Sequence, residues 1–300
     1  MSKKVKSVSL YRYDILENGL ADETTDWNEY IQNKTDYNTN DQIIKEITVG
    51  KYGEPDQVTE FLYDEHNKLI SEEYFLGEEE ASETVEYIYD AHDKIVQEIH
   101  QFGDGSTDIT DYQYNEKGQL VSKTLTSDDG EIEKKEKFDY SGDWVIKEIS
   151  EESLGNIVTE NTYTYNDHGI VTESEQVVIQ DGRRERLVNY FDDAGQRVKS
   201  LRYNHQDKLI EINRFNYQDN RLIEIEEETQ RGNYFIRFSY DDQGNIISQE
   251  EVNDSGAVTS TIEREFDEEG RLIEAVMYVD GQNYRPNQHY IIKYVYEFFE

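Results

Sequence analysis

Histidine is the side chain that most often binds metal ions or transfers protons near neutral pH, and three of the six histidines recur at one position. His66, His92 and His168 each stand three residues after a tyrosine, in segments that we predict to be equivalent turns. A metal-binding row is one interpretation. Equivalent turns, however, would lie two strands apart, roughly 9.5 Å, which is too far for two ligands of one ion. We therefore interpret these histidines as turn residues that tolerate a left-handed backbone.

Asp or Asn follows most of the same aromatic residues and offers oxygen ligands for calcium. The spacing lacks the alternating carboxylates and the central glycine of an EF-hand loop. Asp and Asn also hydrogen-bond their own backbone two residues on and so favour turns. Turn formation is thus the preferred interpretation, and no metal or cofactor is predicted. The residues concerned are Asp64, Asp90, Asn115, Asn166, Asp192, Asp241 and Asp267.

Catalytic motifs with a defined spacing are missing from the sequence. It contains no Gly-x-Ser-x-Gly elbow, no Walker loop and no His-Glu-x-x-His segment. Pairs of carboxylates suited to glycoside hydrolysis exist, but acids are so common that any one pair is uninformative. We predict that the protein is not an enzyme. An enzyme acting on polysaccharide is the third hypothesis, after a binding protein and a structural component.

The charge is strongly unbalanced: 67 acidic and 30 basic residues give a net charge of −37. Such a surface repels nucleic acid and anionic membranes, because both need clustered Lys and Arg. A basic protein partner would be attracted and its encounter accelerated. Acidity also keeps β-rich proteins soluble, so solubility is the competing explanation. The candidate partner-binding residues are the two acidic runs Glu78, Glu79, Glu80 and Glu226, Glu227, Glu228, with a solvated rim as their alternative interpretation.

The cysteine count and the first residues of the chain indicate a compartment. There is no cysteine, which excludes disulfides and fits a reducing compartment. The beginning, Met1 to Val8, is basic but no apolar stretch follows it, so it does not read as a signal peptide. No apolar run approaches the roughly 20 residues of a membrane-spanning helix. We expect a cytoplasmic protein.

The chain is built from a repeat of about 26 residues. An aromatic-x-aromatic pair is followed by Asp or Asn, two or three polar residues, often Gly, and then Leu-Ile or a similar pair, as in Phe238 to Ile247. The second aromatic of each unit marks the repeat. The spacing of these markers stays between 23 and 26 residues from Tyr37 to Phe266. The markers that we predict to define the core are Tyr63, Tyr89, Tyr114, Tyr140, Tyr165, Phe191, Tyr217, Tyr240 and Phe266.

Each unit predicts two strands and two turns. Both aromatics of the pair lie on one face of a strand, because side chains alternate with period two. Gly supplies the positive φ that closes the hairpin, and only 2 Pro are present to interrupt a ladder. We predict an all-β chain of about 22 antiparallel strands in one long, twisted or coiled meander. Residues 1–300 form a single array of about 11 units, with an atypical N-terminal cap at 1–36 and a C-terminal cap at 267–300.

The unit Tyr-x-Tyr-Asp-x-x-Gly-x-Leu resembles the YD repeat of the RHS (rearrangement hotspot) family. The segments that carry this resemblance are Phe238 to Ile246 and Tyr112 to Leu120. The chain departs from that family in two ways. The units are longer and more acidic, and the Arg that often precedes Leu occurs only at Arg221 and Arg271, with Arg197 before Val as a less exact match. No toxin-like domain follows the repeats. The resemblance implies a β-sheet, and it does not carry over the enclosure of a toxin, because 300 residues make too small a shell.

Two functional hypotheses of different classes follow. The first is a non-enzymatic repeat protein that binds a basic protein, most concretely a cytoplasmic immunity or antitoxin-like protein that neutralises a toxin or effector. The second is a structural component of a larger assembly of the secretion or injection type, for which self-association is possible. Defined multimers would favour the second, and a one-to-one complex would favour the first.

Overall fold

The computed structural model describes residues 3–15, 30–50, 53–77, 80–281 and 287–300. These residues form 22 β-strands and one short 3-10 helix, η1 (Ser153–Gly155). Every strand pairing is antiparallel, so the prediction of an all-β chain of antiparallel hairpins is confirmed. The chain divides into two compact units: unit 1 comprises residues 1–82 and 234–300, and unit 2 comprises residues 83–233.

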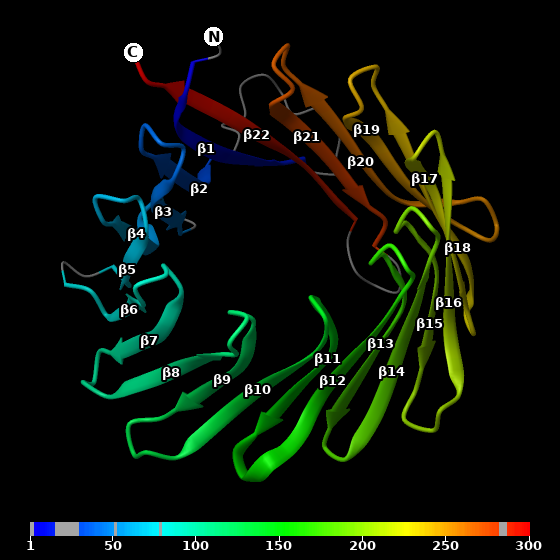
Figure 1. The fold of residues 1–300 in the computed structure, drawn as a ribbon. Helices are drawn as coiled ribbons and strands as arrows, with labels where there is room; N and C mark the ends of the chain where they lie inside the picture. The colour runs from blue at the N-terminus through cyan, green and yellow to red at the C-terminus, as the bar shows by residue number, and fades with distance from the viewer. Residues whose placement is uncertain (1–2, 16–29, 51–52, 78–79, 282–286) are drawn as a thin grey trace. The chain divides into compact units, whose positions relative to one another are not determined.

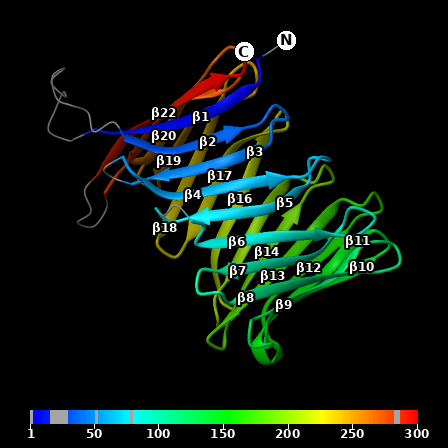
Figure 2. The ribbon, with the colours of Figure 1, turned by 90° about the vertical axis from the view of Figure 1, so that its left-hand side faces the viewer.

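Unit 1 contains strands from both ends of the chain (Figures 1 and 2). Its pairing order is β18-β19-β20-β21-β22-β1-β2-β3-β4-β5. The strands are β1 (Val5–Asp14), β2 (Tyr30–Tyr37), β3 (Ile43–Val49), β4 (Pro55–Tyr63), β5 (Leu69–Phe75), β18 (Gly232–Tyr240), β19 (Ile246–Asn253), β20 (Val258–Phe266), β21 (Leu272–Val279) and β22 (Gln288–Phe298).

The first and last strands pair with each other, which a simple meander does not do. Val8 lies opposite Tyr296, and Ser7 donates a hydrogen bond to the Glu297 carboxylate at 2.8 Å. The two segments predicted as caps therefore supply neighbouring strands of unit 1. Pairing removes two exposed backbone edges that would otherwise recruit other chains.

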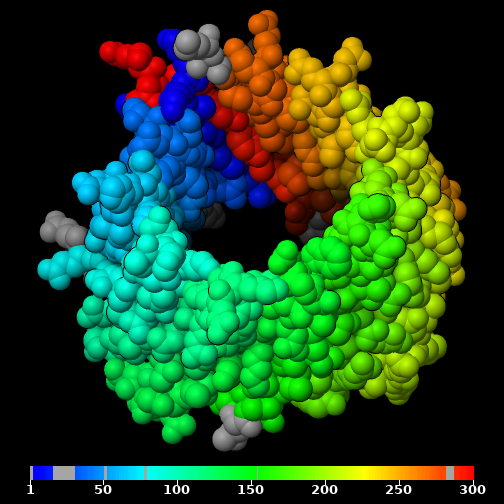
Figure 3. All heavy atoms as spheres, in the orientation of Figure 1, coloured from blue at the N-terminus to red at the C-terminus, as the bar shows by residue number. Residues whose placement is uncertain are grey.

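Unit 2 is an uninterrupted meander in which each strand pairs with the next along the chain. Its strands are β6 (Glu83–Tyr89), β7 (Ile95–Phe102), β8 (Thr107–Tyr114), β9 (Leu120–Thr126), β10 (Ile132–Ser141), β11 (Trp144–Glu152), β12 (Asn156–Tyr165), β13 (Val171–Gln180), β14 (Arg183–Phe191), β15 (Arg197–Tyr203), β16 (Leu209–Gln218) and β17 (Arg221–Thr229). In the ribbon view these strands lie side by side in a single layer (Figure 1), and the same residues are drawn as spheres, coloured from cyan to yellow, in Figure 3.

Most turns share one five-residue geometry. Around Asp64, the Asp64 amide donates to the Lys68 carbonyl, the Asn67 amide donates to the Asp64 carbonyl, and Asn67 has a φ of 64°. The Asp64 carboxylate also accepts the amides of His66 and Lys68. Asp and Asn were thus correctly predicted as turn residues. Gly holds the positive φ at most equivalent positions, whereas Asp or Asn holds it at Asp41, Asn67, Asp93 and Asp207.

Every marker from Tyr63 to Phe266 occupies the same structural position. It is the last or the last but one residue of the first strand of a hairpin, and the register shifts by one residue immediately before it. We call the sheet face that carries the markers the marker face, and the other the reverse face. A β-bulge of this kind bends the strand and strengthens its twist.

Few side chains are fully buried. Among the described residues, the buried apolar ones are Val177, Val188, Leu201, Phe215, Val252 and Ala275. The markers are half-buried. Val188 pairs with Leu201, and both lie on the reverse face, one residue out of phase with Phe191. Aliphatic packing in this part of unit 2 is therefore not on the face that the aromatic repeat indicates.

Candidate binding surface on the marker face of unit 2

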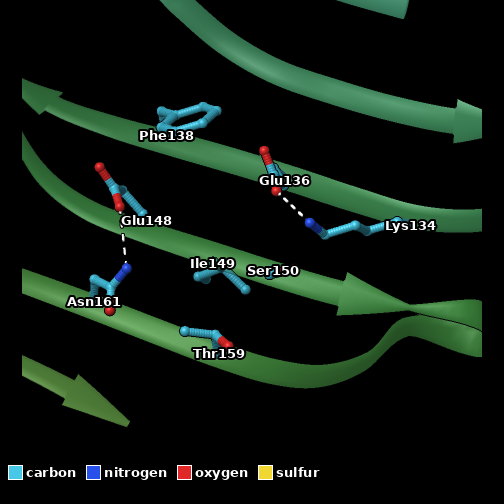
Figure 4. A pocket seen from close by; sticks show the side chains of 8 residues that line it. All are labelled: Lys134, Glu136, Phe138, Glu148, Ile149, Ser150, Thr159 and Asn161. Atoms are coloured by element: carbon cyan, nitrogen blue, oxygen red, sulfur yellow. Dashed lines mark hydrogen bonds and ion pairs between the residues drawn. The ribbon is translucent and has the colours of Figure 1, made fainter. Parts of the chain in front are cut away.

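Two adjoining hollows lie on the marker face of unit 2. The first has a volume of about 240 Å³ and spans β10, β11 and β12 (Figure 4). Phe138, Glu136, Glu148 and Asn161 line it, together with Lys134, Ile149, Ser150 and Thr159. Phe138 and Glu148 are directly paired across β10 and β11, so ring and carboxylate share one face.

The Glu148 carboxylate is held by neutral donors. Asn161 Nδ2 donates to it at 3.1 Å, and the Tyr163 hydroxyl donates at 3.2 Å. Burial, assisted by the nearby Glu148 charge, raises the pKa of Tyr163 to about 12. Among the described residues, no Lys or Arg forms an ion pair with Glu148. The Oδ1 atom of Asn161 is buried and has no hydrogen-bond partner among them either. Hydrogen-bond acceptors are therefore in excess at this point.

Glu136, on the other side of the first hollow, is already neutralised. Lys134 Nζ lies 2.6 Å from one of its carboxylate oxygens, and Lys123 Nζ lies 3.8 Å from the other. Lys123 also lies over the Tyr112 ring, 5.2 Å from its centroid, within the range of a cation–π contact. An ammonium group between an aromatic ring and a carboxylate is thus already present on this face.

The second hollow has a volume of about 410 Å³ and spans β13 to β16. Here basic side chains are supplied by the chain itself. Arg197 covers the Phe215 ring at 4.2 Å, and Arg202 lies 3.5 Å from Glu185 and 3.6 Å from Glu211. The two hollows adjoin, because Asn161 of the first lies directly opposite Gln176 of the second. The two hollows are neighbours on the marker face and differ in their electrostatics.

The predicted partner-binding residues do not form a single patch. Glu78 and Glu79 lie outside the described residues, and Glu80 is exposed. Glu226 and Glu228 lie on the reverse face, where Arg214 pairs with them at 3.4 Å and 3.0 Å. Glu227 lies on the marker face opposite Asn213. Because consecutive residues of a strand alternate between faces, a run of three acids cannot present three carboxylates to one partner surface.

The repeating histidines occupy exposed turns. The backbone amides of His66, His92 and His168 each donate to the turn Asp or Asn two residues earlier. Within the described ranges, no group of three or more His, Cys, Asp or Glu side chains is placed to hold a metal ion. The turn position predicted for these histidines is confirmed, but the left-handed backbone is not, because the positive φ lies one residue later, at Asn67, Asp93 and Gly169.

One copy of the turn motif was missed by the sequence analysis. The spacing of Tyr63, Asp64 and Leu69 recurs at Tyr203, Asn204 and Leu209. This copy closes the hairpin of β15 and β16, at the opposite strand ends from the turn that follows Phe191. The Tyr203 ring lies under the Arg186 guanidinium at 3.9 Å, and Arg186 also contacts Asp207 at 3.0 Å. The interval of 12 residues from Phe191 hid this copy from a search for a 26-residue period.

Comparisons with known proteins identify little. A family described as "Uncharacterised protein" matches residues 185–297, fewer than half of the chain. No curated protein matches the sequence. A solved structure, a porin-like protein from Bacteroides uniformis ATCC 8492, aligns over 98% of both chains with 10% identity and a TM-score of 0.33, which is too low to establish a shared fold. The described residues contain no helix long and apolar enough to cross a membrane.

Proposed function

We propose that this chain is a non-enzymatic, cytoplasmic repeat protein that binds a basic protein partner. Its most concrete form is an immunity or antitoxin-like protein that neutralises a toxin or effector. The observation that carries the proposal is an excess of carboxylates that the fold does not neutralise. The net charge of −37 and the resemblance to RHS/YD repeats point the same way.

Two cross-strand pairs in unit 1 illustrate the excess. Glu60 lies directly opposite Glu73, and Glu265 lies directly opposite Glu274. Each pair has one lysine for two carboxylates: Lys45 lies 2.7 Å from Glu60, and Lys293 lies 3.2 Å from Glu274. Like charges directly opposite one another destabilise a sheet. A basic partner offsets this repulsion on binding, and the long-range field accelerates its approach.

The test begins with affinity capture from host lysate at low and high salt, followed by measurement of Kd with the purified partner. Charge reversal at Glu73 should weaken the binding of a basic partner. It should leave the stability of the fold unchanged or raise it, because it converts a repulsive pair into an attractive one. Gln57→Lys, at the exposed end of β4, is the control for net charge alone. Equal affinity of the wild type, Glu73→Lys and Gln57→Lys at low salt would contradict the proposal.

The acidic runs provide a second arm. Reversal at Glu226 and Glu228 also removes their ion pairs with Arg214, so its effect on stability has to be measured beside affinity. Reversal of Glu78, Glu79 and Glu80 is the companion variant. Loss of binding without loss of unfolding free energy would support a contact at the altered run.

The alternative is a structural component of a larger assembly. Exposed apolar side chains on β3, β4 and β5 favour it: Ile44, Leu62 and Ile70 are each about two-fifths exposed. Analytical ultracentrifugation discriminates the two functions. Salt-resistant multimers that dissociate on Leu62→Lys would support the assembly, whereas a monomer at all concentrations would count against it.

A further inference from the structure

We infer that the first hollow on the marker face of unit 2 is a receptor for one guanidinium or ammonium group of the bound partner. This inference rests on the proposed function and assigns a contact point to it. The hollow joins the Phe138 ring to the Glu148 carboxylate, which has no cationic partner among the described residues. Together these groups match the face, the charge and the hydrogen-bond donors of an arginine or lysine side chain.

The carboxylate is the principal attraction. Among the described residues, the donors to Glu148 are the neutral groups of Asn161 and Tyr163, so no cationic side chain pairs with this carboxylate. An ion pair formed there is screened less by solvent than one on an open face.

The second hollow shows how this chain fills the equivalent space from within. Arg197 starts β15 and covers Phe215, which stands two residues before the marker Tyr217. Phe138 stands two residues before the marker Tyr140, and the residue equivalent to Arg197 is Leu120, at the start of β9. The marker hydroxyls confirm the equivalence, since Tyr217 donates to the Arg197 carbonyl and Tyr140 to the Leu120 carbonyl. The position that Arg197 holds in one repeat is thus held by an aliphatic residue in the other.

The remaining charges around the hollow nearly cancel. Glu136 is matched by Lys134 at 2.6 Å and approached by Lys123 at 3.8 Å. Of the three charged side chains that line the hollow, Lys134 offsets Glu136, and Glu148 is the one without a cationic partner among the described residues. A second cation would meet Lys134, so the hollow selects one basic group rather than a cluster.

Nα-acetyl-arginine methylamide is the probe, titrated into the ¹⁵N-labelled full-length protein at low salt. The side-chain amide signals of Asn161 are the readout, because this amide contacts Glu148. We expect saturable shifts with the arginine compound and none with the citrulline analogue, which keeps the shape and loses the charge. Equal shifts with both compounds would overturn the inference.

Three variants locate the binding. Glu148→Gln should lower the affinity for the probe about tenfold, since it removes the negative charge and keeps the shape of the side chain. Leu120→Arg should abolish binding, because it transplants the Arg197 arrangement and fills the hollow in cis. Thr162→Ala, on the reverse face beside Asn161, should leave binding unchanged. Non-saturable shifts that are the same in all variants would mean that only the general negative field attracts the probe.

The two proposals fail separately. A partner that binds wild type, Glu148→Gln and Leu120→Arg equally, and is released by salt, leaves the proposed function standing and refutes the receptor. Conversely, saturable probe binding without any basic partner in the lysate supports the receptor and removes the proposed function. Circular dichroism of each variant checks that Leu120→Arg keeps its strands, as Arg at the equivalent position does naturally.

Discussion

Two stretches of unit 2 solve the same packing problem in different ways. From β9 to β12, repeats are linked by polar contacts on the marker face: the Tyr140 hydroxyl donates to the Leu120 carbonyl at 2.8 Å, and the Tyr165 hydroxyl donates to the Val145 carbonyl at 2.6 Å. From β13 to β15 the marker is Phe191, which has no hydroxyl. There the buried Val177, Val188 and Leu201 pack on the reverse face.

The difference shows that the ring, the hydroxyl and the aliphatic core are separable parts of one repeat. Each register shift next to a marker leaves a backbone carbonyl that needs a partner, and the next tyrosine along the array supplies it. Where the tyrosine is replaced, burial of aliphatic side chains stabilises the sheet instead. Both stretches have a hollow on the marker face: the first hollow lies in the stretch with polar links and the second lies opposite the aliphatic packing of the reverse face.

The largest expected effect comes from cutting the aliphatic core. Leu201→Ala should lower the unfolding free energy by about 3 kcal/mol, because it leaves a cavity beside Val188. Leu120→Ala, in the stretch with polar links, should cost about half as much, because Leu120 is less buried. Urea denaturation of both variants measures the difference. Equal losses would mean that the two stretches do not differ in their packing.

Exchanging the marker residues sharpens the comparison at a smaller scale. Tyr140→Phe should cost about 1 kcal/mol, since the Leu120 carbonyl loses its donor. Phe191→Tyr should stabilise by up to about 1 kcal/mol if its hydroxyl reaches the Val171 carbonyl, which is the equivalent acceptor 20 residues earlier. The same denaturation experiment applies. A destabilised Phe191→Tyr variant would show that the reverse-face packing has moved this marker out of register.

The smallest expected effect is the loss of stability in acid that comes from the carboxylates of the turns. The backbone amide of Lys94 holds the pKa of Asp90 below 3.8, and that of Lys68 does the same for Asp64. A folded-state pKa below the unfolded value adds stability above that value, and this stability is lost as pH falls through the folded pKa. The Asp64→Asn, Asp90→Asn variant should therefore lose less stability than wild type between about pH 5 and about pH 3.

Asn115 and Asn166 provide the internal reference for that experiment. Both accept the same pair of backbone amides as Asp90 but do not titrate. Replacing them with Asp should increase the loss of stability in acid. If neither substitution changes the acid dependence, the turn carboxylates do not contribute to it, and other carboxylates dominate.

Much of the local structure was predictable. The alternation around Tyr112 and Tyr114 predicts a strand, and Asn115 with Gly118 predicts the turn, because period two and a positive φ are properties of the chain itself. Asn67 and Asp93 hold the same positive φ without glycine, which the pattern alone did not reveal. The hydroxyl links were also missed, although Tyr rather than Phe at most markers was an available signal.

The candidate site was beyond the sequence for a different reason. Phe138, Glu148 and Asn161 come from three strands and meet only through their registers, which single-residue slips would change. Alternation places Glu226 and Glu227 on opposite faces of the sheet, so the members of this acidic run do not share one surface. Proximity in sequence therefore misled, and cross-strand pairing decided which acids share a surface.

The sequence by itself determined that the chain forms antiparallel hairpins with a repeat of about 26 residues, since propensity, alternation and turn chemistry act over a few residues. Only the tertiary structure decided that β1 pairs with β22, that Val188 and Leu201 are buried on the reverse face, and that Glu148 is left without a cation. Those outcomes depend on contacts between residues far apart in the chain, and a local pattern does not specify its partner.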